Sequence, residues 1–464
     1  MLPYKSTFVA REIKRINSLG VYLDYKDSKI NWYLCGTAIL ESPFFFCTNF
    51  ILDRSGELND GYQTPFPHSI FYAAVFYLFL TIFFLKKILQ LYQCNYYTII
   101  IMQLLLVLGT SVTDYVNFDA GFSHIYSLFA ITAFIFFIKN YLEKRKYSDF
   151  LISCILLGLI ILIRPVNGII IFFIPFLAGS FRKLWEEIVF LVKNSGKTLF
   201  GIVIVAGLIS IQFTLWYLQT GSIFINTYND VGFNFLKPEW VNVLFSYRKG
   251  LFVYTPVLFL AITALIWLGV KKRYFELVWW FFFFALTTYI ISSWNCWYYG
   301  ASFGLRAFID FYTVFFILFA IMFGKLSVWL RITYLIPAIF LVCVNIIQTY
   351  KYKMYILDWG NMDKDKYWTI FLKTDEKMKG LVWKKKYNYI NYQKTEEILV
   401  GDLNIPALTV STILRINSSQ IKNFNNAAFF EVSFNKDFQE SNDARILLYI
   451  KEINSDSVVY YHER

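Results

Sequence analysis

The sequence has 464 residues, of which 57% are hydrophobic, 21% aromatic and only 16% charged. A soluble globular domain is usually about 25% charged, so this composition excludes an ordinary water-soluble protein, and it also excludes a disordered chain, a coiled coil and a disulfide scaffold. The net charge of +12 does not indicate a nucleic-acid partner, because the basic residues stand between apolar runs instead of covering one face. We therefore expect membrane lipids around most of the chain.

Residues 1–68 are expected to form a loop region with one interfacial helix at the exoplasmic, outer face of the membrane. Residues 36–52 are apolar and aromatic but contain Glu41 and Pro43. The alternation of the later spans places both ends of this segment near the outer face, so we expect a helix that lies along the membrane surface. Residues 1–28 contain no apolar leader, and we expect that an N-terminal span is missing from this sequence.

Residues 69–349 contain ten apolar stretches that predict membrane segments. A bilayer core of about 30 Å is crossed by about 20 apolar residues in a helix. The stretches are residues 69–85, 96–110, 122–138, 150–163, 168–177, 199–218, 251–270, 275–291, 305–323 and 326–347. The stretch at 168–177 is short and reads as half of a broken pair. The expected fold is therefore an α-helical polytopic membrane protein with about 9–10 membrane segments.

The connections between these stretches predict how the body sits in the membrane. Alternate connections carry basic clusters, as at residues 139–146, 182–197 and 271–273, whereas the other connections carry few cations. The positive-inside rule places the basic set in the cytoplasm. The long connections at 53–68, 113–123, 220–250 and 293–304 then face outward, as does the tail.

Residues 350–464 are expected to form an exoplasmic tail that begins as a linker. From about residue 397 the apolar pattern changes from helical to alternating, for example in residues 427–434, 444–450 and 458–461. This change predicts a small, partial and mainly β domain at the C-terminus.

The first candidate motif is TDYVNFDAGFSHIYS, residues 113–127, which lies where two predicted spans meet the outer face. It places Asp114, Asp119 and His124 within eleven residues of a chain that has few ionisable groups. A carboxylate here can act as a general base or hold a cation, and the imidazole can bind phosphate or a metal. Helix capping and interface anchoring are the alternative explanation. We predict catalytic roles for Asp119 and Asp114 and phosphate binding by His124.

The second motif is RPVN, residues 164–167, which interrupts an apolar stretch of nearly thirty residues. An arginine at such a depth costs about 2.5–3.5 kcal/mol on insertion scales, and a broken helix frees backbone groups that can help to hold an anion. The alternative is an arginine that reaches toward lipid headgroups. We predict that Arg164 binds phosphate.

The third motif is SWNCWYYGASFGLRAFID, residues 293–310. Aromatic side chains suit the C–H faces of sugar rings, and a cation at the entrance of a span can hold a phosphate. An aromatic membrane belt is the alternative for the tryptophans. We predict substrate binding by Trp294, Trp297, Tyr298 and Asp310, phosphate binding by Arg306, and an i,i+4 pair between Arg306 and Asp310.

These motifs resemble those of the GT-C superfamily, the multi-pass glycosyltransferases that use polyprenyl-phosphate sugars and include protein O-mannosyltransferases and the lipid A aminoarabinose transferase. The closest similarity is to bacterial membrane glycosyltransferases that share six elements in the same order over about residues 18–371. The elements are GTAILE-x-PFFF at 36–46, DGY-x-x-P at 60–65, D-x-x-x-SH-x-YS at 119–127, RP-x-N at 164–167, W-x-x-WYYG-x-SFG-x-R-x-F-x-D at 294–310 and D-W-x-x-M-x-x-x-x-YW-x-x-F at 358–371.

The resemblance implies inverting transfer of a sugar from a polyprenyl-phosphate donor to a lipid, glycan or protein acceptor, in the bacterial inner membrane with a periplasmic tail. It implies no certain cofactor, and a divalent cation stays open. The family's general base is an Asp just after the first span, and this sequence resembles a chain that begins after that point. The alternatives are therefore an inactive truncated glycosyltransferase, a polymerase or ligase of surface polysaccharide, and a polysaccharide or lipid transporter or flippase.

Overall fold

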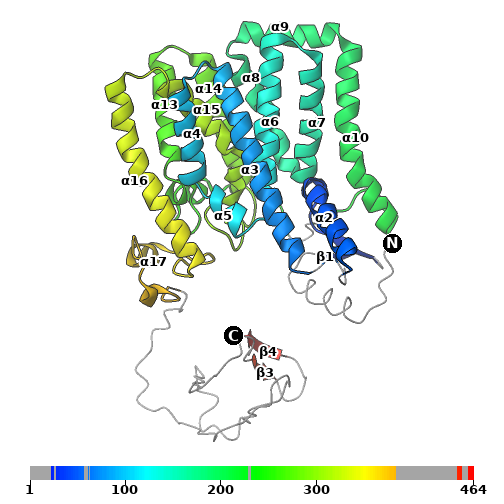
Figure 1. Cartoon of the computed structure of the whole chain (residues 1–464), viewed down its shortest axis with the longest axis vertical. Helices are drawn as coiled ribbons and strands as arrows, with labels where there is room; N and C mark the ends of the chain where they lie inside the picture. The colour runs from blue at the N-terminus through cyan, green and yellow to red at the C-terminus, as the bar shows by residue number, and fades with distance from the viewer. Residues whose placement is uncertain are drawn as a thin grey trace, which may run out of the picture. The chain divides into compact units, whose positions relative to one another are not determined.

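The computed structural model describes residues 22–25, 28–56, 61, 63–227 and 231–382, together with two strands near the C-terminus (Figure 1). The chain divides into two units, Met1–Tyr387 and Asn388–Arg464. The first unit is a bundle of α-helices, most of which run side by side.

Six helices of the described part are long and apolar enough to cross a membrane. These helices indicate a multi-pass α-helical membrane protein. They are α3 (Pro65–Leu91), α6 (Ser123–Lys144), α10 (Ser195–Thr220), α14 (Tyr274–Ser292), the continuous pair η2 (Arg306–Phe311) and α15 (Tyr312–Phe323), and α16 (Val328–Lys353). Each coincides with one of the stretches expected from the sequence.

Six of the ten expected segments are long enough to span a membrane, and the remaining four are shorter apolar helices. They are α4 (Tyr96–Leu108), α7 (Tyr147–Ile163), the pair η1 (Pro165–Phe173) and α8 (Ile174–Ala178), and α12 (Leu251–Tyr254) with α13 (Leu258–Val270). Proline explains two of the breaks. Arg164 is extended, with φ −151° and ψ 111°, directly before Pro165, and Pro256 separates α12 from α13. The proline ring disfavours the helical conformation of the residue that precedes it.

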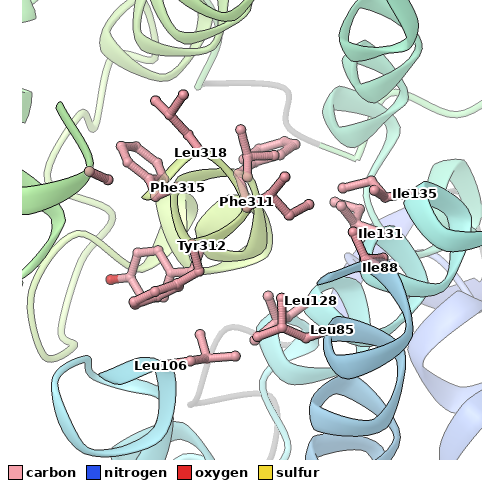
Figure 2. Close-up of a cluster of buried hydrophobic side chains, with 14 of the residues drawn as sticks. Leu85, Ile88, Leu106, Leu128, Ile131, Ile135, Phe311, Tyr312, Phe315 and Leu318 are labelled. Atoms are coloured by element: carbon pink, nitrogen blue, oxygen red, sulfur yellow. The ribbon is translucent and has the colours of Figure 1, made fainter. Parts of the chain in front are cut away.

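The centre of the bundle is formed by α6 and by η2 with α15. In these two segments 83% and 94% of the most apolar stretch is buried, compared with 11% in α10 and 17% in α16, which lie at the outer edges of the bundle (Figure 1). Figure 2 shows Phe311, Tyr312 and Phe315 surrounded by leucine and isoleucine side chains of α3, α4 and α6. This packing fixes the start of α15 against the first turns of α6.

The segment expected as a cytoplasmic loop at 182–197 is instead largely a helix, α9 (Phe181–Lys193). Its N-terminus is capped by Ser180, whose Oγ accepts a hydrogen bond from the backbone N–H of Lys183 at 3.3 Å. Figure 1 shows α9 lying crosswise at one end of the bundle, between α8 and α10.

The N-terminal part contains a hairpin of β1 (Tyr22–Tyr25) and β2 (Ser28–Asn31), followed by α2 (Gly36–Ser55). The helix expected at 36–52 is thus present, and its place along the membrane surface stays a prediction. An added Cβ at Gly36 would collide with the backbone of Leu162 and Ile163. Glycine therefore lets α2 begin directly against the end of α7.

The first unit continues past the boundary expected at Tyr350. A second hydrophobic cluster joins Tyr352 and the residues after it to Tyr254 and Phe303 of the bundle. The short elements of this end are α5 (Val112–Asn117), α11 (Trp240–Phe245), α17 (Lys364–Thr369) and η3 (Glu376–Met378).

The described part of the second unit is a single antiparallel pair of strands, β3 (Leu447–Lys451) and β4 (Val458–Glu463). Both strands fall on stretches where alternation predicted them. The rest of the β domain expected from about residue 397 lies outside the described residues.

Candidate functional site

The side chain of Asp310, in η2, contacts side chains from two other parts of the chain. Its Oδ1 lies 2.7 Å from Nδ1 of His124, in the first turn of α6. Its Oδ2 accepts a hydrogen bond of 2.7 Å from the amide of Asn167 in η1 and lies 3.6 Å from Nε of Arg164. The break between α7 and η1 and the start of α6 therefore meet at one buried carboxylate.

This arrangement differs from the expected pair between Arg306 and Asp310. The two residues lie in a 3-10 helix, which has three residues per turn, so positions i and i+4 point about 120° apart instead of sharing a face. Asp310 is fully buried, and both of its oxygens are engaged by His124, Asn167 and Arg164. The carboxylate is therefore placed to hold these side chains, and direct contact with a sugar stays a prediction.

Arg164 is the more accessible member of this group. Its Nη1 lies 3.4 Å from Nε2 of His124, and its side chain is 26% exposed, whereas His124 is almost fully buried. His124 thus links Asp310 on one ring nitrogen to Arg164 on the other. The imidazole is placed to orient the guanidinium, and Arg164 has the free surface that an anion would need.

Arg306 is linked to the same imidazole through an aromatic ring. Its guanidinium carbon is 4.8 Å from the ring centroid of Phe122, and that centroid is 6.3 Å from the centroid of His124. Within the described part of the chain, Nε of Arg306 is buried without a hydrogen-bond partner. An unused buried donor on a cation is uncommon, and it is what a bound anion would satisfy.

The two predicted catalytic carboxylates lie beside this cluster. Oδ2 of Asp119 accepts a hydrogen bond of 3.3 Å from the hydroxyl of Tyr352. Burial raises the pKa of Asp119, while that hydrogen bond and the charges of Arg306 and Lys249 act in the opposite direction. Asp119 is therefore near both cations and ready to take up a proton at a higher pH than an exposed carboxylate does.

Asp114 in α5 is fully buried, and among the residues described neither of its oxygens has a hydrogen-bond partner. Burial raises the pKa of Asp114 to about 7. The charge of Asp119 acts in the same direction, whereas the hydroxyl of Thr349 and the charge of Lys353 act to lower the pKa. The charge of Asp119 thus favours the protonated form of Asp114.

Lys249 is a member of the cluster that sequence reasoning did not select. It is 1% exposed, and its Nζ donates to both the carbonyl and the hydroxyl of Ser302. Burial is the main cause that lowers the pKa of Lys249 to about 7, and the positive charges of Arg306 and Arg248 lower it further. The only signal in the sequence was that Lys249 is one of few cations in an outward connection.

Asn167 and Glu41 were also not selected, although both lie within the motifs. The amide of Asn167 donates to Ser127 at 3.1 Å as well as to Asp310, so it ties η1 to α6. Burial raises the pKa of Glu41 to about 7, with the hydroxyl of Tyr126, two residues after His124, acting in the opposite direction. Glu41 therefore reaches the same end of α6 from α2.

The three aromatic side chains predicted to bind substrate pack against other aromatic rings and against an arginine. Trp294 packs against Phe233 with 4.9 Å between ring centroids, and Trp297 packs against Tyr298 at 5.8 Å. The guanidinium of Arg248 lies 3.5 Å from the ring centroid of Tyr298. These rings are partly exposed and line the connection that leads to η2.

In the parts of the chain that the structure describes, no group of three or more His, Cys, Asp or Glu side chains is placed to hold a metal ion. The cluster is instead defined by its cations, Arg164, Lys249 and Arg306, and by the carboxylates Asp119 and Asp310. Side chains of these types can hold an anion beside a proton acceptor. Comparisons of the chain with models of known protein families, with curated proteins and with solved structures gave no match.

Proposed function

We propose that this chain is a membrane glycosyltransferase that moves a sugar, with inversion, from a polyprenyl-phosphate donor to a lipid, glycan or protein acceptor at the exoplasmic face. The observation that carries the proposal is the convergence of Arg164, His124 and Arg306, together with the unused buried Nε of Arg306. The proposed location is the bacterial inner membrane, with the C-terminal tail in the periplasm.

The cations fit the needs of the leaving group. Transfer breaks the bond between the anomeric carbon and the phosphate oxygen, while the sugar passes through an oxocarbenium-like state. Negative charge then grows on the phosphate. Fixed guanidinium groups such as those of Arg164 and Arg306 stabilise that charge without reorganising, provided that they are already held in place. Asp310 and His124 hold Arg164, which makes them positioning residues.

A carboxylate near these cations would take the proton of the acceptor hydroxyl as the new C–O bond forms. Asp119 is the first candidate, because its raised pKa brings it closer to the working range of a general base and its neighbours include Arg306. Asp114 is the second, and the half-buried Glu41 is a third. Trp294, Trp297 and Tyr298 keep their proposed role in substrate binding, whereas Asp310 would act through the side chains that it holds.

The test uses the purified chain of 464 residues in lipid nanodiscs. Undecaprenyl phosphate serves as the binding probe, followed by native mass spectrometry, and a panel of radiolabelled polyprenyl-phosphate sugars with a membrane lipid extract serves for transfer. We expect binding that Arg306→Ala abolishes. Arg331→Ala is the matched control, since Arg331 also stacks over a phenylalanine and has a buried Nε without a partner among the described residues, but lies at the start of α16.

The outcomes separate the alternatives. Binding followed by release of polyprenyl phosphate and formation of a glycoside supports the proposal. Binding without transfer from any donor would favour the inactive alternative and contradict the proposed transfer. Movement of lipid across the bilayer without a new glycosidic bond would identify a transporter or flippase, and it would overturn the proposed enzyme.

A further inference from the structure

The helix α9 has an apolar face that nothing in the bundle covers. Phe181, Trp185, Ile188 and Val192 are 67%, 56%, 42% and 70% exposed. Their spacing of four, three and four residues places them on one side of a helix. The rings of Phe181 and Trp185 stack at 6.4 Å. Exposed apolar rows of this kind mark a contact surface.

The rotation of α9 about its axis is fixed by ion pairs on another side of the helix. Nζ of Lys183 lies 3.0 Å from Glu143, at the end of α6, and Glu187 lies 2.6 Å from Arg145. The guanidinium of Arg145 also lies 5.2 Å from the ring centroid of Phe190. Glu187 is 4% exposed, so releasing this side of α9 would strand a buried charge. The apolar face therefore cannot turn inward.

A third side of α9 is polar and open to solvent, with Arg182, Glu186 and Lys193 exposed. The helix thus has a side bound to the bundle, an apolar side and a charged side. This is the pattern of a helix that lies in the headgroup layer of a membrane, with its apolar side toward the acyl chains and its charged side toward water.

The position of α9 in the chain places it at the level of a lipid headgroup layer. It connects directly to α10, whose 26 residues extend about 39 Å as a helix, longer than a hydrocarbon core of about 30 Å. The first residues of α10 therefore lie near the headgroups. Leu199 and Phe200 at the start of α10 are exposed as well, and only 11% of the most apolar stretch of α10 is buried, so the helix that follows α9 is also apolar and largely uncovered.

We propose that α9 is a membrane-surface helix that inserts Phe181, Trp185, Ile188 and Val192 into the leaflet at its end of the bundle. The occupant of the face is the lipid bilayer itself. Arg182 and Lys193 lie on the border of the face, where they complement the phosphates of anionic headgroups. The inference is independent of the proposed enzyme activity, because the first turn of α6 that holds His124 is separated from Glu143 by nearly the whole length of that helix.

The experiment measures the depth of spin labels in the full chain, reconstituted into vesicles of phosphatidylcholine and phosphatidylglycerol. The six cysteines are replaced, and single labels are placed by Trp185→Cys and Val192→Cys on the apolar face. Glu186→Cys and Lys193→Cys are the matched controls on the neighbouring polar side. We expect the first pair to be accessible to oxygen and protected from a water-soluble nickel chelate, and the controls to show the reverse.

Equal access of the nickel chelate to labels at 185 and 186 would overturn the proposal, and so would protection of 185 and 192 from both reagents, which would indicate a protein partner. A second measurement keeps the native cysteines. Brominated lipids should quench tryptophan fluorescence less in Trp185→Phe than in the wild-type chain. An unchanged quenching would also contradict insertion.

Discussion

Nδ1 of His124 lies 2.7 Å from Oδ1 of Asp310, although 186 residues separate them in the chain. The contact joins the first turn of α6 to η2 and leaves the other ring nitrogen facing Arg164. A buried carboxylate thus fixes the position of an imidazole, and the imidazole in turn faces the guanidinium that has access to solvent.

The first prediction concerns the stability that this carboxylate provides. Asp310→Ala leaves His124, Asn167 and part of Arg164 buried without their shared acceptor, so we expect a loss of about 3–5 kcal/mol, the usual effect of removing one partner of a buried pair. Thermal unfolding in detergent measures it. Glu186→Ala, which removes a carboxylate from an exposed pair on α9, should change stability by less than about 1 kcal/mol. Equal effects of the two substitutions would contradict the structural role.

The second prediction is a dependence of stability on pH that comes from Asp114. Burial raises its pKa to about 7 in the folded chain, compared with about 3.9 in an unfolded chain. Between these values the folded state holds a proton that the unfolded state has released, so stability falls as pH rises, by up to about 1.4 kcal/mol per pH unit. Asp114→Asn should remove this part of the dependence. The unfolding midpoints of the wild-type chain and of Asp114→Asn, measured between pH 4 and 8, test this prediction.

The third prediction applies the same reasoning to Lys249, with the opposite sign. Its pKa is lowered to about 7, below the usual value near 10.4, so between these values the unfolded state binds a proton that the folded state lacks. Stability should therefore rise with pH in this window. Lys249→Met should flatten the rise, whereas Lys364→Met, at an exposed position in α17, should leave it unchanged.

Much of the body could be predicted from the sequence, because each apolar stretch became a helix. Six of the ten stretches form helices long enough to span a membrane, and the other four form shorter helices. The break at Pro165 was predicted from the RPVN motif, whereas the break at Pro256 inside the stretch 251–270 was not. The helix α9 was missed because its charged residues were interpreted as loop residues, although the apolar residues at 181, 185, 188 and 192 follow a helical spacing.

The site was only partly predictable for a related reason. The sequence motifs indicated His124, Arg164 and Arg306. The fold places Arg164 3.4 Å from His124, and it places Arg306 over Phe122, which packs against His124. The sequence interpretation paired Arg306 with Asp310, because i,i+4 spacing assumes an α-helix and the segment forms a 3-10 turn. Lys249 could not be selected, since its importance comes from burial against Ser302, a contact across 53 residues.

The fourth prediction concerns topology. We expect residues 139–149 and α9 to face the cytoplasm, and residues 220–250 and the tail to face the exoplasmic side. Single cysteines in these segments, probed with an impermeant reagent in intact cells, should label only in the second group. Labelling of the tail solely after permeabilisation would place the proposed site in the other compartment.

The last prediction separates binding from chemistry in the proposed site. Arg164→Ala and Arg306→Ala should each lower turnover by about 10²–10³, the usual cost of one preorganised electrostatic contact, and Arg331→Ala should not. Arg164→Lys should recover only part of the loss, because a point charge cannot reproduce the fork of a guanidinium on phosphate.

Asp119→Asn should abolish turnover while binding of undecaprenyl phosphate is retained, because the carboxylate is proposed to take a proton and not to hold the phosphate. In the wild-type chain turnover should fall as pH drops through the raised pKa of the acting carboxylate, since only the ionised form accepts a proton. Steady-state rates and binding measured side by side on the same preparations test both statements. Full transfer by Arg164→Ala, Arg306→Ala and Asp119→Asn together would remove this cluster as the catalytic site, whereas loss of binding in Asp119→Asn would make that residue part of the phosphate contact instead.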